Sequence, residues 1–415
     1  MRMRNLVFFV VILLLLLPIS IFAKEIELTF WHSLGFHVKQ LVEDMVEEYN
    51  RSTPGVKVNP VFQGLYEEMQ VKMMASAVTR QLPDVAQVQF EYMDAYIDNG
   101  IVAPIDDWVT LDLREDIPEN FWELVSKNGH IYGIPFAVST MVFFYNENAF
   151  REAGLDPDKP PETWDDVIRL GKILTRDTDG DGQIDTYAMM FWAEGMYGIA
   201  PFLWEMGGRF ADESGKILLT SPEMVKTISF LKDLVYKYRI MPQNWTDWEG
   251  GQAFLRGKLA MGPFTSAAIS YGEQNLPWKL RIVKMPSMNG IRATALSGSS
   301  LMTFSRKKKR MRASIDFMHF MVSKKNTIRL HKDVGYVPVR LSAIKSLEIR
   351  AFHKEKPNFK VAVESLDFAK PLPRNTEYFK INEIIRDMLQ KVILQNSDPE
   401  IELKKAQERV DELFE

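Results

Sequence analysis

The stretch IELTFWHSLGFHVKQLVEDMVEEY, residues 26–49, decides the fold class of this chain. Residues 26–31 have the pattern of a short strand. Behind them, apolar residues recur at helical spacing, at Val38, Leu41, Val42, Met45, Val46 and Tyr49. The chain therefore opens with a strand that is followed by a helix.

The alternation of strands and helices continues beyond this first unit. Residues 56–61 and 85–89 are expected strands, and residues 66–78 between them are an expected helix. Signals for the start of a helix follow at Thr163 and Ser221. Strands that alternate with helices predict parallel sheets, so the expected fold class is α/β. No repeat of 20–50 residues is present, which argues against solenoids and propellers.

The length of the chain predicts two lobes rather than one core. At 415 residues, it exceeds the ~250–300 residues at which single cores stop growing. Extended stretches punctuated by proline or glycine, which are candidate crossings between lobes, lie at residues 135–140, 285–290 and 334–338. They predict discontinuous lobes, made of residues 24–137 with 288–336 and of residues 138–287 with 337–415. Such a hinge allows the lobes to close over a ligand.

The first 23 residues predict export from the cytoplasm. Arg2 and Arg4 precede an unbroken apolar run at residues 6–19, which is the pattern of a secretory signal peptide, here cleaved after Ala23. We therefore expect a periplasmic or other extracytoplasmic location, and an uncleaved membrane anchor is the alternative. The chain has no cysteine, which excludes a lipoprotein anchor, disulfides and thiolate chemistry.

Composition and motifs favour a binding protein over an enzyme or a nucleic-acid-binding protein. The formal net charge is only −4, and the basic run at residues 306–312 is interpreted as a solvated loop. The chain has no HExxH, GxSxG or P-loop motif, and its six histidines are scattered. We expect no catalysed reaction and no nucleic-acid partner. A pair of glycosidase carboxylates stays open, because Asp and Glu residues are numerous.

An acidic loop at residues 177–188 is the candidate metal site. Its odd positions from one to nine are Asp177, Asp179, Asp181, Gln183 and Asp185, with a glycine at position six, as in the calcium loop of an EF-hand. Position twelve is Ala188 instead of a bidentate glutamate. A structural calcium ion is one interpretation, and a solvated turn of Asp and Gly is the other. No cofactor is expected to be required.

The chain has nine tryptophans, and several of them lie beside turn residues, namely Trp31, Trp192, Trp204, Trp245 and Trp248. Aromatic faces stack on the C–H faces of sugars and polyols. Each of these rings taken singly also suits a protein core. They predict either a ligand wall or ordinary packing.

The chain resembles the family of extracellular solute-binding proteins for sugars and related polyols over essentially its whole mature length. The segments that carry the resemblance are Phe30-Trp31-His32-Ser33, Leu82-Pro83-Asp84-Val85, Gly133-Ile134-Pro135-Phe136, Phe144-Tyr145-Asn146, Pro161-Glu162-Thr163-Trp164, Gly257-Lys258-Leu259-Ala260-Met261 and Gly335-Tyr336-Val337-Pro338. The resemblance implies a two-lobe periplasmic-binding-protein fold with discontinuous lobes, of the class II type. It also implies a monomer that hands its ligand to the permease of an ABC transporter.

The resemblance implies a set of ligand-binding positions as well. Taken residue by residue, the family pattern falls on Tyr66, Glu91, Ser139, Trp192, Ser266, Gly298, Tyr336 and Arg374. Thr265 replaces Ser266 if the alignment slips by one residue. The second tryptophan of a family pair is not kept, because Gly195 stands there. The opening Phe-Trp-His-Ser is most similar to family members that bind glycerol 3-phosphate.

These residue types suit an anionic polyol. A phosphate dianion is bound by an arginine fork together with neutral donors, and a glycerol hydroxyl by a carboxylate such as Glu91. We therefore expect glycerol 3-phosphate or a glycerophosphodiester, held where Arg374 meets Tyr66, Ser139 and Tyr336. A neutral oligosaccharide is the alternative, and for that ligand Arg374 would lie outside the cleft. An exported glycan-active enzyme is the third interpretation.

Overall fold

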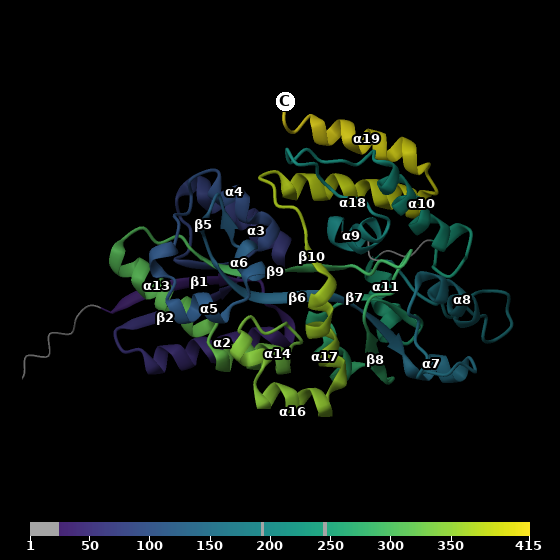
Figure 1. Cartoon of the computed structure of the whole chain (residues 1–415), viewed down its shortest axis with the longest axis horizontal. Coiled ribbons are helices and arrows are strands. Elements are labelled where there is room, and N and C mark those ends of the chain that lie inside the picture. The colour runs from purple at the N-terminus through teal and green to yellow at the C-terminus, as the bar shows by residue number, and fades with distance from the viewer. Residues whose placement is uncertain (1–24, 192–194, 244–246) are drawn as a thin grey trace, which may run out of the picture.

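Two lobes of mixed helix and sheet lie side by side and are joined by long central strands (Figure 1). The computed structural model describes residues 25–191, 195–243 and 247–415. The α/β class and the two-lobe arrangement expected from the sequence are confirmed. The predicted signal peptide at residues 1–23 lies outside the described residues.

The first lobe is built on parallel strands that alternate with helices. Strand β1 (Ile26–His32) pairs in parallel with β2 (Val56–Phe62) and β3 (Val85–Gln89), and the connecting helices are α2 (Phe36–Ser52) and α3 (Tyr66–Thr79). The apolar side chains of β1 and α2 are buried in one core. The opening unit therefore forms for the expected reason, because apolar residues at strand and helix spacing face the same interior.

Two antiparallel strands, β6 (Ile134–Asn146) and β9 (Thr294–Thr303), run through both lobes. Strand β9 pairs with β3 of the first lobe. The second half of β6 pairs with β7 (Met261–Thr265) and β8 (Leu280–Val283) of the second lobe. The sheet order is β2-β1-β3-β9-β6-β7, so paired strands connect the lobes without a break.

The three candidate crossings lie in different surroundings. Residues 135–140 lie in β6, where the chain passes between the lobes. Within residues 334–338, Val337 pairs with Val138 of β6. Within residues 285–290, Ser287 pairs with Thr163 of the second lobe, and β9 is the strand that crosses after this stretch. The lobe limits given above stay a prediction.

Helices surround the strands in both lobes (Figure 1). Those near the first lobe are α4 (Met93–Ile97), α5 (Leu111–Asp116), α6 (Glu119–Glu123), α13 (Lys308–Met321) and α14 (Lys324–Asp333). Those of the second lobe include α7 (Glu147–Glu152), α8 (Trp164–Leu174), α9 (Met196–Glu205), α10 (Pro222–Tyr236), α11 (Asp247–Leu255) and α12 (Ile269–Asn275).

The last part of the chain is mostly helical. It contains α15 (Leu341–Ile344), α16 (Leu347–Glu355), α17 (Pro357–Glu364), α18 (Tyr378–Gln395) and α19 (Pro399–Asp411). Helices α18 and α19 pack on α10 of the second lobe. Short elements are β4 (Ser126–Lys127), β5 (His130–Ile131), β10 (Ala369–Pro371) and the 3-10 helices η1 (Phe90–Tyr92), η2 (Asp106–Trp108), η3 (Ser266–Ala268) and η4 (Ser365–Phe368).

Two helix starts show the expected capping chemistry. The Thr163 hydroxyl accepts the backbone N–H of Asp166 over 3.1 Å, and the Asp166 carboxylate accepts the N–H of Thr163 over 3.2 Å. The Ser221 hydroxyl accepts the N–H of Met224 over 3.2 Å, and Pro222 occupies the first helical position. These bonds satisfy N–H groups that have no partner within a helix. The predicted starts of α8 and α10 are confirmed.

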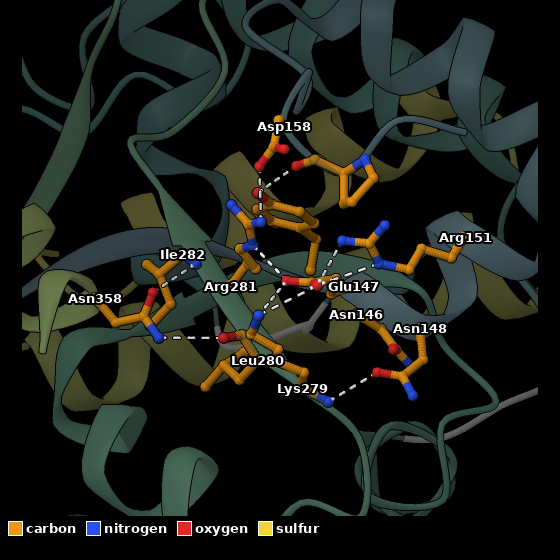
Figure 2. Close-up of polar contacts among 12 residues, drawn as sticks. Asn146, Glu147, Asn148, Arg151, Asp158, Lys279, Leu280, Arg281, Ile282 and Asn358 are labelled. Carbon is orange, nitrogen blue, oxygen red and sulfur yellow. Dashed lines mark hydrogen bonds and ion pairs between the residues drawn. The ribbon is translucent and has the colours of Figure 1, made fainter. Parts of the chain in front are cut away.

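A buried carboxylate connects α7 to β8 in the second lobe (Figure 2). The Glu147 side chain is 6% exposed and binds Arg151 Nη2 over 2.9 Å, Lys279 Nζ over 3.0 Å and Arg281 Nε over 2.6 Å. The hydrogen bond from Arg281, above all, lowers the pKa of Glu147 to about 2. Arg281 also binds Asp158 over 2.7 Å. The network therefore fixes β8 against both α7 and the segment that follows it.

The basic run at residues 306–312 is largely helical rather than a loop, because α13 begins at Lys308. Most of its side chains are exposed, as expected, although Arg310 binds Asp84 over 2.8 Å. Among the described residues, we find no helix with both the length and the apolar character that a membrane span requires.

Candidate functional site

A cavity of about 540 Å³ lies between the lobes, at the middle of the central strands. The start of α3 forms its first-lobe wall, and α18 contributes to the opposite wall. The lining includes the tyrosines Tyr66, Tyr92, Tyr197, Tyr336 and Tyr378. The cavity therefore offers hydroxyl groups and aromatic faces from both sides.

Tyr66 and Tyr336 approach each other through their hydroxyl groups. Tyr66 is the first residue of α3, and its hydroxyl accepts a hydrogen bond from Gln87 Nε2 over 3.0 Å and donates to Ser299 Oγ over 3.4 Å. Burial raises the pKa of both phenols. Both groups therefore stay neutral at ordinary pH, and the single proton of Tyr66 is donated to Ser299.

The central strands approach each other closely where Ser139 and Gly298 line the cavity. Gly298 has a φ of 133°, and a Cβ atom there would lie 2.0 Å from the backbone oxygen of Ala137. Only glycine fits this position. The backbone of β9 is thus open to the cavity, with no side chain above it.

Thr265 lines the cavity, whereas Ser266 lies behind it. Ser266 is fully buried, and its hydroxyl accepts the backbone N–H of Thr140 over 3.3 Å. Thr265 ends β7 and reaches the cavity. The structure therefore places Thr265, the residue given by the slipped alignment, at the cavity, and not Ser266.

Glu91 lies behind the cavity rather than on it. It is 1% exposed, and Ser297, which does line the cavity, donates from Oγ to Glu91 Oε1 over 2.9 Å. The second carboxyl oxygen, Oε2, is buried without a hydrogen-bond partner among the described residues. Because burial disfavours the charged form, the pKa of Glu91 is raised to about 7.

Arg374 also lies away from the main cavity, which differs from the expectation. Its guanidinium donates to the backbone oxygens of Leu124 and Ser126 over 2.7 and 2.6 Å and lies 3.4 Å from Asp94 Oδ1. Together with Glu91 it lines a separate cavity of about 150 Å³. The structure does not bring Arg374 to the tyrosines and Ser139, because groups of the first lobe already occupy its donors.

Arg386 is the arginine that lines the cavity among the described residues, and the sequence interpretation missed it. It lies on α18, where Tyr378, Asn382 and Arg386 recur every four residues and share the cavity wall. Its Nη1 atom lies 2.5 Å from Glu67 Oε1 and 3.2 Å from Glu383 Oε1. The four-residue spacing, which puts the three side chains on one helix face, was the available signal.

Asn382 explains why glycine stands at position 195 in place of the family tryptophan. Gly195 has a φ of 69°, and a Cβ atom there would lie 2.1 Å from Asn382 Oδ1. The same oxygen accepts the N–H of Met196 over 2.9 Å. A side chain at Gly195 would therefore displace Asn382 from the start of α9. Trp192, the first tryptophan of the pair, lies outside the described residues.

A smaller apolar cavity of about 170 Å³ adjoins the main one. Met141, Phe191 and Phe264 line it, and it shares Tyr197 and Thr265 with the main cavity. The site therefore continues from a hydroxyl-rich region into an apolar one.

The other tryptophans singled out above do not extend this wall. Trp31 is half-buried and Trp204 is 8% exposed, and neither is among the described residues that line the two cavities. Trp245 and the side chain of Trp248 lie outside the described part of the chain. For Trp204, which contacts Phe210 at a ring distance of 6.4 Å, the packing interpretation holds.

The acidic loop brings three of its five predicted ligands together. Asp177, Asp179 and Asp185 each offer a carboxylate oxygen, and these oxygens all lie within 4.8 Å of one another. The carboxylate of Asp181 is not part of this group. Asp177 accepts hydrogen bonds from two backbone N–H groups of the loop itself. These bonds already stabilise the negative charge of the Asp177 carboxylate. A calcium ion here stays a prediction.

Residues 44–361 match the family model described as bacterial extracellular solute-binding protein. The chain belongs to this family. One relative of this solute-binding protein is the sn-glycerol-3-phosphate-binding periplasmic protein UgpB of Salmonella paratyphi A. It is 24% identical over an alignment of 408 residues, which covers 93% of this chain and 92% of the relative. UgpB of Escherichia coli is 24% identical over 403 residues, with the same coverage.

Solved structures of solute-binding proteins have the same fold. UgpB from Mycobacterium tuberculosis in complex with glycerophosphocholine has a TM-score of 0.83 at 20% identity and covers 94% of this chain and 98% of its own. The maltose/maltodextrin-binding domain MalE from Bdellovibrio bacteriovorus, bound to maltotriose, has a TM-score of 0.81 at 21% identity and covers 94% and 100%. The family resemblance drawn from the sequence motifs is thus confirmed.

Proposed function

We propose that this solute-binding protein captures glycerol 3-phosphate or a glycerophosphodiester between its lobes and delivers it to the membrane subunits of an ABC importer. The observation that carries the proposal is the convergence of Tyr66, Ser139, Gly298 and Tyr336 on one cavity that also holds Arg386. The relatives named for sn-glycerol 3-phosphate and the complex with glycerophosphocholine support the same ligand class.

Each group of the cavity has a task in binding such a ligand. The guanidinium of Arg386 donates hydrogen bonds to phosphate oxygens, and the hydroxyl of Tyr336 does so by turning from Tyr66 toward the ligand. The carbon chain of the glycerol packs on tyrosine faces. Lobes that close around the ligand exclude water and so strengthen these polar contacts.

A neutral oligosaccharide is the second candidate, and two features of the cavity favour it. Tyrosines line both sides, and aromatic faces stack on sugar rings. Glu67 and Glu68 also line the cavity, and their carboxylates repel an anionic ligand. Arg374 lies outside the cavity, as expected for a neutral oligosaccharide. The MalE domain of Bdellovibrio bacteriovorus, with a similar fold, has maltotriose bound.

We further propose that residues 1–23 are a signal peptide that directs the chain to the periplasm or envelope. The apolar run behind Arg2 and Arg4 and the extracellular character of the family support this. The protein then acts as a monomer, catalyses no reaction and requires no cofactor. Its partners are the small ligand and the permease.

Thermal denaturation of the purified protein with glycerol 3-phosphate, glycerophosphocholine or maltose separates the two ligand classes. A ligand at about 100 times its Kd stabilises the folded state by about 2.7 kcal/mol and raises Tm. We expect the phosphate compounds to raise Tm, and Tyr336→Phe to weaken this response. Tyr145→Phe is the matched control, since its hydroxyl binds the backbone oxygen of Pro157 over 2.9 Å, away from the cavity lining. A response to maltose alone contradicts the proposal.

A further inference from the structure

An ion pair spans the cavity between the lobes. Glu67 lies on α3 of the first lobe and Arg386 on α18, and both side chains line the cavity. Arg386 Nη1 lies 2.5 Å from Glu67 Oε1, and the two side chains are 30% and 52% exposed. A ligand that enters the cavity therefore meets this pair directly.

The two arginines near the cavity differ in what holds them. Arg374 donates to two backbone oxygens, which move only if the first-lobe chain moves. Arg386 is bound by the side-chain carboxylates of Glu67 and Glu383, which can rotate away. Exposed ion pairs contribute little to stability, so replacing Glu67 by another anion costs the fold little. Arg386 is thus the guanidinium that can exchange its partner.

We propose that Arg386 binds the anionic group of the ligand. Without ligand, the Glu67 carboxylate pairs with the Arg386 guanidinium, and the anionic group displaces it on entry. A phosphate offers the fork of oxygens that a carboxylate offers, with more charge, so it competes well for the same donors. A neutral sugar has no group that can replace Glu67. The pair of Glu67 and Arg386 therefore determines whether the cavity accepts anions. This inference rests on the proposed function and names the residues that select its ligand.

Calorimetric titration with glycerol 3-phosphate and with inorganic phosphate tests the inference. We expect Arg386→Gln to weaken the binding of glycerol 3-phosphate by about 10- to 100-fold, because hydrogen bonds to a charged group are lost. The matched control is Arg409→Gln, since Arg409 lies on α19, binds Asp387 of α18, and is not part of the cavity lining. This control should leave the affinity unchanged.

Glu67→Gln tests the second half of the inference without removing the arginine. We expect it to tighten the binding of glycerol 3-phosphate by about 2- to 5-fold, because the competing carboxylate is neutralised. Glu383→Gln is its control, since Glu383 binds the same Arg386 Nη1 from within α18 but is not part of the cavity lining.

The outcomes separate this inference from the proposed ligand class. If wild-type protein binds glycerol 3-phosphate and a folded Arg386→Gln variant binds it equally well, the inference is overturned and the ligand class stands. If Glu67→Gln gains no affinity over Glu383→Gln, the role of Glu67 is overturned. Wild-type protein that binds neither glycerol 3-phosphate nor glycerophosphocholine contradicts both proposals. Tm of each variant without ligand shows which variants are folded.

Discussion

Glu147 and Glu91 are both buried, at 5% and 1% exposure, but their surroundings satisfy them in opposite ways. Glu147 lies in the second lobe and binds three cationic side chains (Figure 2). These contacts lower its pKa to about 2. Glu91 lies behind the ligand cavity, accepts one hydroxyl bond and has a pKa raised to about 7 by burial. A carboxyl that supports the fold is fully paired, whereas the carboxyl beside the cavity keeps an unpartnered oxygen, as groups at functional sites often do.

The largest effect on stability is expected from the fully paired carboxyl. Glu147→Gln removes the carboxylate that Arg151, Lys279 and Arg281 share, and only Arg281 keeps another ion-pair partner among the described residues, Asp158. We therefore expect the free energy of unfolding to fall by about 2 kcal/mol at pH 7. Urea denaturation followed by circular dichroism measures it. The control Glu348→Gln removes a 55% exposed carboxylate that binds only Lys332 among the ion pairs of the described residues, and should cost less than about 0.5 kcal/mol. Equal losses in the two variants would contradict the comparison.

Acid should remove the contribution of Glu147 in wild-type protein. Its pKa is lowered from 4.5 to about 2, so the stability from the ionised form is present above pH 4.5 and is lost as the pH falls toward 2. We therefore expect the stability difference between wild type and Glu147→Gln to narrow as the pH is lowered from about 5 to about 3. A constant difference over this range would show that the charge of Glu147 does not stabilise the fold.

Glu91 should show the opposite dependence on pH. Because its pKa is raised from 4.5 to about 7, the stability that comes from its protonated form is present below pH 4.5 and is lost as the pH rises through 7. Glu91→Gln, which stays neutral, is expected to be more stable than wild type at pH 8 and equal to it at pH 4. Denaturation at the two pH values measures this, and a gain that is the same at both would contradict the raised pKa.

The smallest effect on stability is expected from the ion pair across the cavity. Glu67→Gln should change the free energy of unfolding by less than about 0.5 kcal/mol, because an exposed pair contributes little. The same urea denaturation, without ligand, measures it. A loss as large as that of Glu147→Gln would mean that Glu67 and Arg386 hold the lobes together rather than select a ligand.

Local chemistry made much of the fold predictable from the sequence. Strand β3 has the predicted limits of residues 85–89, and α3 extends one residue beyond the predicted 66–78. Thr163 caps α8 as expected, because its partner Asp166 is only three residues away. Interactions within one turn or one strand depend on neighbours in the sequence, and these can be identified without the structure.

The candidate site was only partly predictable, because its members depend on packing between distant segments. Tyr66, Gly298 and Tyr336 were named from the family pattern and do line the cavity. Arg374 was placed there too, but it binds backbone oxygens about 250 residues away in the sequence, at Leu124 and Ser126. No local pattern signals such a contact.

The central claim is that the ligand lies in the cavity between α3 and α18. A crystal structure with glycerol 3-phosphate bound tests it most directly. We expect the phosphate within hydrogen-bond distance of Arg386, with Tyr66 and Tyr336 beside the ligand and the Glu67 carboxylate turned away from the guanidinium. A phosphate held by Arg374 with Arg386 still paired to Glu67, or a ligand outside this cavity, would contradict it.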